Sequence, residues 1–136
     1  MTPDLRLYAL VDPEHTGGHD LADLTRAVAR GGATLVQLRD KVGSTRQMIE
    51  RARALVAALT GSGVPLIVND RVDVALAAGA GGVHVGQDDM AVADARRLLG
   101  RDAITLPAWV DKDRVLVAGL APGALDRLGG PAESVR

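Results

Sequence analysis

Charged and amide side chains follow three short apolar runs of this sequence, at the points where those runs end. A basic stretch, residues 37–41, follows the first run, and acidic turns at residues 69–71 and 86–89 follow the other two. If the runs are neighbouring parallel strands, these side chains meet at the carboxyl edge of one sheet, where α/β folds place their chemistry. Two cations from one turn and carboxylates from two others predict a pocket for a phosphorylated ligand held with a divalent metal.

The basic stretch places Arg39 and Lys41 two residues apart, so both side chains point the same way if the backbone stays extended. Such a pair suits a diphosphate, because arginine binds it bidentately and lysine binds it as a point charge. The competing interpretation is a solvated turn in which Asp40 neutralises one of the two cations.

The acidic turns suit a metal ion. Asp70 follows an apolar run that ends at Val68, and the pair Asp88 and Asp89 follows another. Mg²⁺ prefers a few carboxylates together with ligand phosphates and water. The competing interpretation is that these residues cap the helices that follow, since Asn and Asp favour that position.

The histidines and the short catalytic motifs do not indicate another site. His84 falls inside an apolar run, which favours a packed, hydrogen-bonded histidine over a metal ligand. His15 and His19 lie in a glycine-bearing loop without the helical H-x-x-x-H spacing of a zinc site. The sequence has no cysteine, no G-x-S-x-G elbow and no Walker loop.

Composition narrows the function classes. With 136 residues and 47% apolar content, the chain is long enough for one domain with a real core. A net charge of −1 and 1% aromatic residues argue against nucleic acid as a partner. No apolar run approaches the ~20 residues that span a bilayer, and no signal core follows Met1. We therefore expect a soluble, cytoplasmic protein without a membrane partner.

Hydrophobic periodicity predicts four strand–helix units in succession. The predicted strands are residues 5–11, 33–38, 64–68 and 82–85, and the predicted helices start after the caps Asp20 and Ser44, at Val72, and at Met90 or Ala91. Glycine-rich turns between them predict parallel strands joined by right-handed crossovers. Residues 103–106 and 115–118 are weaker strand candidates, and Pro107 cuts the first of these short. We expect no regular structure in residues 129–136.

Three stretches together resemble the thiamine phosphate synthase family. They are residues 37–41, 68–75 and 82–89, and residues 7–13 fit the same family. The resemblance covers roughly residues 5–100. It implies a (β/α)₈ TIM barrel, here truncated to about four βα units. The expected division is a partial barrel domain at residues 1–100 and a divergent, irregular tail at residues 101–136.

The resemblance also implies an activity. The family couples hydroxymethylpyrimidine diphosphate to thiazole phosphate and releases pyrophosphate, a transferase step of thiamine biosynthesis. The diphosphate leaves first and the thiazole nitrogen captures the pyrimidine carbocation, so no protein nucleophile is required. The roles implied are contact with the pyrimidine diphosphate for Gln37, Arg39, Lys41 and Asn69, and binding of Mg²⁺ for Asp70 and Asp89.

The second half of the family pattern is not found. The family ends its fifth strand in Gly-x-Ser or Gly-x-Thr, whereas residues 104–109 read Ile-Thr-Leu-Pro-Ala-Trp. We expect a truncated or frame-altered gene product, which sequencing of the flanking DNA would test. Two alternatives stay open: a thiazole tautomerase-like protein with His84 as base, and a non-catalytic fragment that binds or oligomerises. Half a barrel would leave edges at strand one and at strand four or five, which favours a homo-oligomer.

Overall fold

Strands and helices alternate along the chain in the computed structural model, which describes residues 3–86, 88–107 and 115–117. The strands are β1 (Tyr8–Val11), β2 (Leu35–Leu38), β3 (Leu66–Asn69), β4 (Gly82–Val85), β5 (Ile104–Pro107) and β6 (Val115–Val117). The helices are α1 (Leu21–Arg30), α2 (Thr45–Leu59), α3 (Val72–Ala78) and α4 (Val92–Leu99). The predicted α/β class is confirmed.

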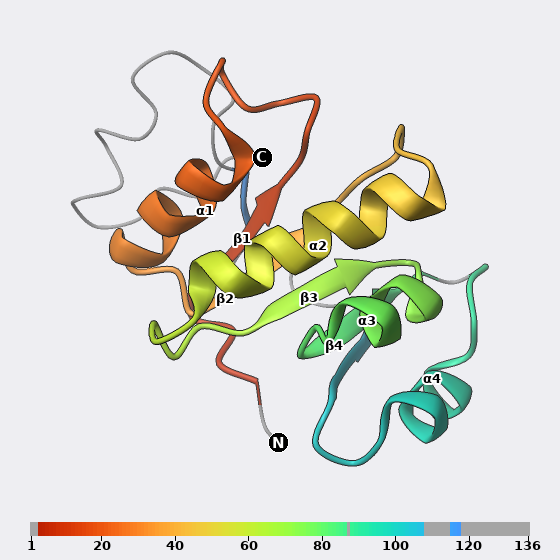
Figure 1. Ribbon diagram of the computed structural model, residues 1–136. Helices are drawn as coiled ribbons and strands as arrows, with labels where there is room; N and C mark the ends of the chain where they lie inside the picture. The colour runs from red at the N-terminus through yellow and green to blue at the C-terminus, as the bar shows by residue number, and fades with distance from the viewer. Residues whose placement is uncertain (1–2, 87, 108–114, 118–136) are drawn as a thin grey trace.

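All strands belong to one parallel sheet with the order β5-β4-β3-β2-β1-β6. From β1 to β5 each strand lies beside its predecessor, with a helix as the crossover. This is the arrangement of successive units in a βα-barrel. Figure 1 shows α1, α2 and α3 in front of the strands, so these helices cover one face of the sheet.

The sheet is wider than the four predicted units, because its flanks are occupied. Residues 115–117 pair with β1, so the prediction that strand one is an edge is wrong. On the other flank, β5 pairs with β4 although it lies in the predicted tail. Ile104 and Leu106 are buried, which explains why β5 holds to the sheet. Pro107 is the last residue of β5, which within the described residues pairs with β4 alone, and proline is tolerated on an edge strand. Residues 129–136, expected to be irregular, lie outside the described residues.

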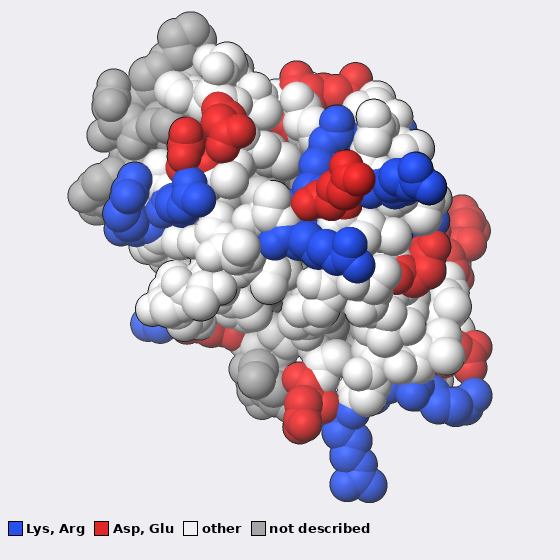
Figure 2. Space-filling model, viewed as in Figure 1, with Lys and Arg blue, Asp and Glu red and all other residues white. Residues whose placement is uncertain are grey.

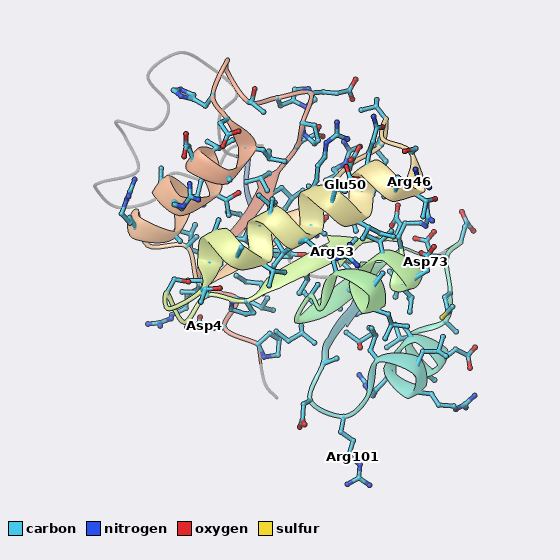
Figure 3. All side chains as sticks on the ribbon, viewed as in Figure 1. Asp4, Arg46, Glu50, Arg53, Asp73 and Arg101 are labelled. Carbon is cyan, nitrogen blue, oxygen red and sulfur yellow. The ribbon has the colours of Figure 1, made fainter. Side chains whose placement is uncertain are left out.

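The two longest helices begin at the predicted caps. Asp20 Oδ2 accepts the Asp23 N–H at 3.1 Å and starts α1. Ser44 and Gln47 form a reciprocal capping box at the start of α2. One stripe of α2 is buried: Met48, Ala52, Leu55 and Leu59. Figure 3 shows Arg46, Glu50 and Arg53 along its outer face, so α2 packs on the sheet as an amphipathic helix.

The strands are apolar on both faces, as predicted. Their helix-facing residues join the larger core, in which Val36, Val68 and Val83 are buried. Strand residues that point to the opposite face belong to a second cluster, formed by Tyr8, Leu35, Ile67, Ile104 and Leu106. Because side chains alternate along a strand, polar residues nearer the carboxyl ends share this second face. The sheet thereby brings polar side chains together near the carboxyl ends of its strands.

Charged side chains of both signs are intermingled over the helix-covered face in Figure 2. This is the pattern of a solvated surface and not of a basic nucleic-acid footprint. Within the described residues, no helix combines the length and the apolar character needed to cross a bilayer.

Candidate functional site

The turns that follow β1 and β2 are joined by an ion pair. Arg39 comes directly after β2, and its Nη1 donates to Asp12 Oδ2 at 2.9 Å. Asp12 comes directly after β1 and is buried, with 3% of its surface exposed, whereas the Arg39 side chain is 40% exposed. A buried carboxylate therefore holds the Arg39 guanidinium, and part of the Arg39 side chain stays exposed to solvent.

The turns after β2 and β3 are joined by a second ion pair. The Lys41 ammonium donates to Asp70 Oδ2. Burial alone would raise the pKa of Asp70. The hydrogen bond from the Lys41 ammonium, together with the positive charge of Lys41, instead holds that pKa below its usual value. Asp70 is therefore a carboxylate at neutral pH and can bind a cation.

Asp70 adopts a backbone conformation that is rare for a residue with a side chain. Its φ is 68°, and it is the one non-glycine residue with positive φ in the part of the chain that the structure describes. Two backbone hydrogen bonds hold this turn: Asp70 N–H to His84 O and Arg71 N–H to Asn69 O, both 2.8 Å. Strain of this kind persists where the surroundings enforce it, often at functional sites.

Arg71 anchors the same turn to two helices. Its guanidinium donates to Thr45 Oγ1 of α2 at 3.0 Å and to Asp73 of α3 at 2.7 and 2.9 Å. Figure 3 shows Asp73 near the end of α2 that carries Arg46, on the side toward which the β3 arrow points. Arg71 thus supports the Asp70 turn from the helix layer.

Asp89 approaches Asp70 from the turn after β4. The Gly86 N–H donates to Asp89 Oδ2 at 2.7 Å. A methyl group built on Gly86 would lie 2.8 Å from Asp89 Oδ2 and 3.9 Å from Asp70 Oδ1, so both carboxylates flank this glycine. Within residues 3–86, 88–107 and 115–117 there is no group of three or more potential metal-binding side chains. The donor set here is two carboxylates, which suits Mg²⁺ when substrate phosphates and water complete its coordination.

The competing interpretations of these acidic residues are wrong. The N-cap of α3 is Arg71 and that of α4 is Ala91, and neither helix has a side-chain cap. Asp70 and Asp89 therefore cap neither helix.

Asp40 does not neutralise its sequence neighbours. It is buried and accepts hydrogen bonds from Arg51 Nη1 at 2.6 Å and from the Val42 and Gly43 N–H groups. Burial raises the pKa of Asp40, but these hydrogen bonds outweigh it, so the pKa lies below its usual value. This pair fixes the loop between β2 and α2, and both cations of the basic stretch are left to pair with other residues.

Polar side chains of the second sheet face meet behind these turns. Gln37 Nε2 and Tyr8 Oη each lie 2.9 Å from His84 Nδ1, and Gln37 also hydrogen-bonds Tyr8. Burial lowers the pKa of His84 and raises that of Tyr8. His84 is thus the packed, hydrogen-bonded histidine that the sequence predicts. Asn69 of β3 is in register with His84 of β4 and is partly buried.

The structure therefore places the predicted residues in two contact groups and one buried polar cluster. Arg39 pairs with Asp12, Lys41 joins Asp70 and Asp89, and Gln37 belongs to the buried polar cluster with Tyr8 and His84. Sequence reasoning missed the roles of Asp12, Tyr8 and Arg71. Asp12 had a usable signal, since it directly follows an apolar run, as Asp70 does.

Three comparisons with known proteins bear on the family and the fold of this chain. A family model described as "Thiamine monophosphate synthase" matches residues 7–106. The thiamine-phosphate synthase of Agrobacterium fabrum is 50% identical over 135 residues, which cover 97% of this chain and 60% of that protein. The same enzyme of Xanthobacter autotrophicus is 54% identical over 101 residues, which cover 74% of this chain and 48% of that protein.

A solved structure shares the fold. The thiamine phosphate pyrophosphorylase of Pyrococcus furiosus superposes with a TM-score of 0.66 at 24% identity, over 87% of this chain and 62% of that one. The expectation of a partial TIM barrel is confirmed. The chain thus spans at most 60% of the length of the two curated relatives named above. The matches to the family model and to these relatives show that the chain belongs to the thiamine monophosphate synthase family.

Proposed function

We propose that the turns after β2, β3 and β4 bind the diphosphate of a pyrimidine methyl diphosphate together with Mg²⁺, for transfer of the pyrimidine methyl group to a thiazole phosphate. The observation that carries this proposal is the convergence of Lys41, Asp70 and Asp89 from three successive strand ends. Family membership supports the choice of ligand, because the relatives named above are thiamine-phosphate synthases.

The charges of the site favour joint binding of metal and diphosphate. Two cations, Arg39 and Lys41, stand beside three carboxylates, Asp12, Asp70 and Asp89. Without a metal, this set is net negative and repels a diphosphate. A divalent cation reverses the sign, so the affinity for diphosphate depends on Mg²⁺.

Each residue then has a distinct task. Asp70 and Asp89 hold the Mg²⁺, which when bound offsets the charge that gathers on the pyrophosphate leaving group. Arg39 offers a fork of donors and Lys41 a point charge to the phosphate oxygens. Gln37, from the buried cluster with Tyr8 and His84, and Asn69, in register with His84, supply neutral amide groups to the ligand. This division needs no protein nucleophile, in keeping with a chain that has no cysteine.

Proton transfer by His84, as a thiazole tautomerase-like activity requires, is less well supported. Gln37 and Tyr8 both contact Nδ1 of this histidine, and burial lowers its pKa. The cations and carboxylates at the strand ends would also have no task in such a reaction. We therefore favour diphosphate binding over general-base chemistry at this site.

The binding half of the proposal is tested by calorimetry with inorganic pyrophosphate, with and without Mg²⁺. We expect binding that needs Mg²⁺ and that Asp70→Asn and Asp89→Asn each weaken by about 100-fold. Asp94→Asn is the matched control, because Asp94 is an exposed carboxylate that pairs with Arg97 on α4. Equal affinities for all four proteins would remove the site assignment.

The transfer half is tested by complementation of a thiamine auxotroph. Growth supported by the chain, and lost in Asp70→Asn, is the result expected of a thiamine phosphate synthase. Pyrophosphate binding without growth would instead support the alternative of a non-catalytic binding protein. This distinction matters because the chain matches 60% of the length of the Agrobacterium relative.

Self-association is a further part of the proposal. Within the described residues, β5 and β6 each pair with one strand only, and unpaired strand edges favour pairing between copies. Sedimentation velocity over a hundredfold concentration range tests it. A concentration-independent monomer that unfolds cooperatively would contradict a homo-oligomer.

A further inference from the structure

We infer that Asp12 is the positioning residue that holds the Arg39 guanidinium ready for the diphosphate. This inference rests on the function proposed above. It adds a residue from the turn after β1 to a site that the sequence predicted from later turns.

The placement of Asp12 follows from the sheet. β1 and β2 are parallel neighbours in which Val11 is paired with Leu38. Asp12 and Arg39 are the next residues on each strand, so they leave the sheet side by side. The Arg39 N–H still bonds Val11 O at 2.9 Å, and this contact keeps the two chains together up to the ion pair.

The contacts of Asp12 are those of a fixed group. Oδ2 accepts from Arg39 Nη1 at 2.9 Å and lies 3.4 Å from His15 Nδ1, while Oδ1 accepts the Glu14 N–H at 2.8 Å. The carboxylate is nearly buried, with 4% of its side chain exposed. A buried carboxylate needs a paired cation, so Arg39 cannot leave without a large penalty.

Arg39, the partner of Asp12, keeps part of its guanidinium available for a ligand. The Arg39 side chain is 40% exposed. A guanidinium has five N–H donors in a rigid fork, and the contact with Asp12 uses one of them. The remaining donors can bind phosphate oxygens in a geometry that Asp12 has already set. Such preorganisation improves affinity because the side chain is ordered before the ligand arrives.

Asp40 is a buried carboxylate with a structural role only. Asp40 is also buried, but it pairs with Arg51 of α2 and with backbone N–H groups of its own loop. Its loss should destabilise the fold without acting through Arg39. Asp40→Asn is therefore the matched control for the loss of a buried, paired carboxylate.

A double-mutant cycle tests the inference with Mg²⁺ and inorganic pyrophosphate as the probe. The proteins are the unmodified chain, Asp12→Asn, Arg39→Gln and the double variant, each checked for folding by circular dichroism. We expect Asp12→Asn to weaken binding about fivefold when Arg39 is present and by less than about twofold when it is replaced. Asp40→Asn combined with Arg39→Gln should be additive.

The outcomes separate this inference from the proposed function. If Arg39→Gln leaves the affinity unchanged, the diphosphate site itself is misassigned. If Arg39→Gln weakens binding, then an Asp12→Asn effect that is absent, reversed in sign, or equal in both backgrounds overturns the positioning role alone. Should Asp12→Asn fail to fold, Asp12→Glu keeps the charge and shifts the carboxylate by one methylene. That variant should still weaken binding when Arg39 is present and not when it is replaced, and any other pattern counts against the inference.

Discussion

The two ends of the sheet solve the same backbone problem with different residues. At the amino ends of the strands, the chain leaves α3 through Gly79, whose φ is 68°. At the carboxyl ends it enters α3 through a turn at Asp70, whose φ is also 68°. Glycine adopts this conformation without strain, whereas aspartate adopts it at a disadvantage of about 1 kcal/mol.

The contrast between Gly79 and Asp70 agrees with the proposed site at the carboxyl end. Gly32, Gly61 and Gly63, which also have positive φ, lie in the turns that precede β2 and β3. These turns need only to reverse the chain. In the proposed site the turn after β3 also presents a carboxylate, which Lys41 contacts, and Arg71 ties this turn to α2. In the turn after β3, strain is therefore kept where the proposed site needs a side chain.

Replacement of Asp70 by glycine should have the largest effect on ligand binding. Asp70→Gly makes the two ends alike: it relieves the left-handed backbone and removes a proposed Mg²⁺ ligand. We expect Mg²⁺-dependent pyrophosphate affinity to fall by about 100-fold or more, while the free energy of unfolding stays equal or rises by up to about 1 kcal/mol. Calorimetry and urea denaturation measure the two quantities. A variant that binds normally, or that is destabilised by more than 1 kcal/mol, would contradict the strain–function account.

The carboxylates of the two ends should differ as much as the turns do. The Asp40 side chain is fully buried against Arg51, whereas the Asp4 side chain at the amino end is 41% exposed beside Arg6. Asp40→Asn should destabilise the fold by about 3 kcal/mol, because it leaves a charged partner uncompensated. Asp4→Asn should change stability by less than about 0.5 kcal/mol. Urea denaturation of both variants checks this, and similar losses would mean that burial does not separate the two ends.

The sequence could predict the elements, because their signals are local. The Asp20 and Ser44 caps and the apolar period of α2 place two helices, and the run at residues 82–85 is β4 as observed. The carboxyl-end location of the site follows from the order of strands and turns. These features depend on neighbours in the chain, which is what a sequence displays directly.

Partners across the sheet could not be predicted in this way. Asp40 stands between Arg39 and Lys41 in sequence, yet it pairs with neither. In extended chain, alternate side chains point to opposite faces. The spacing that separates Asp40 from both cations also turns it toward α2. Likewise, only the folded sheet brings residues 115–117 beside β1.

Removal of the Lys41 charge should change the binding of metal and of diphosphate in opposite directions. Lys41 holds Asp70 in the absence of metal, so it competes with Mg²⁺ for the same carboxylate. Lys41→Met should strengthen the binding of Mg²⁺ alone by severalfold, and weaken that of pyrophosphate in saturating Mg²⁺ by about tenfold. Titrations with Mg²⁺ alone and with pyrophosphate in saturating Mg²⁺ measure these two changes in affinity, which should have opposite signs. Two changes in the same direction would show that Lys41 is not exchanged between carboxylate and phosphate.

The corresponding change at the amino end should affect stability alone. Gly79→Ala forces a side chain into the left-handed conformation, although no atom lies within 4 Å of the added methyl group. Strain is then the whole effect, and we expect a loss of about 1 kcal/mol with unchanged pyrophosphate affinity. Gly81→Ala, in the same turn, tests packing instead, because its methyl group would meet Pro65 at 3.2 Å. Impaired binding in Gly79→Ala would mean that the amino end also serves the site.

The pH dependence of the Asp40 pair gives the smallest effect and the most specific one. The pKa of Asp40 is depressed in the folded chain, so its stabilising contribution is present above the unfolded pKa of about 3.9 and is lost as the pH falls through the folded value. The difference in unfolding free energy between the unmodified chain and Asp40→Asn should therefore be constant from pH 7 to about pH 5 and shrink below about pH 4. Because Asp70 and Asp73 also have depressed pKa values, their effects are common to both proteins and cancel in this difference. A difference that grows on acidification would mean that Asp40 is protonated in the fold, and its pairing with Arg51 would have to be abandoned.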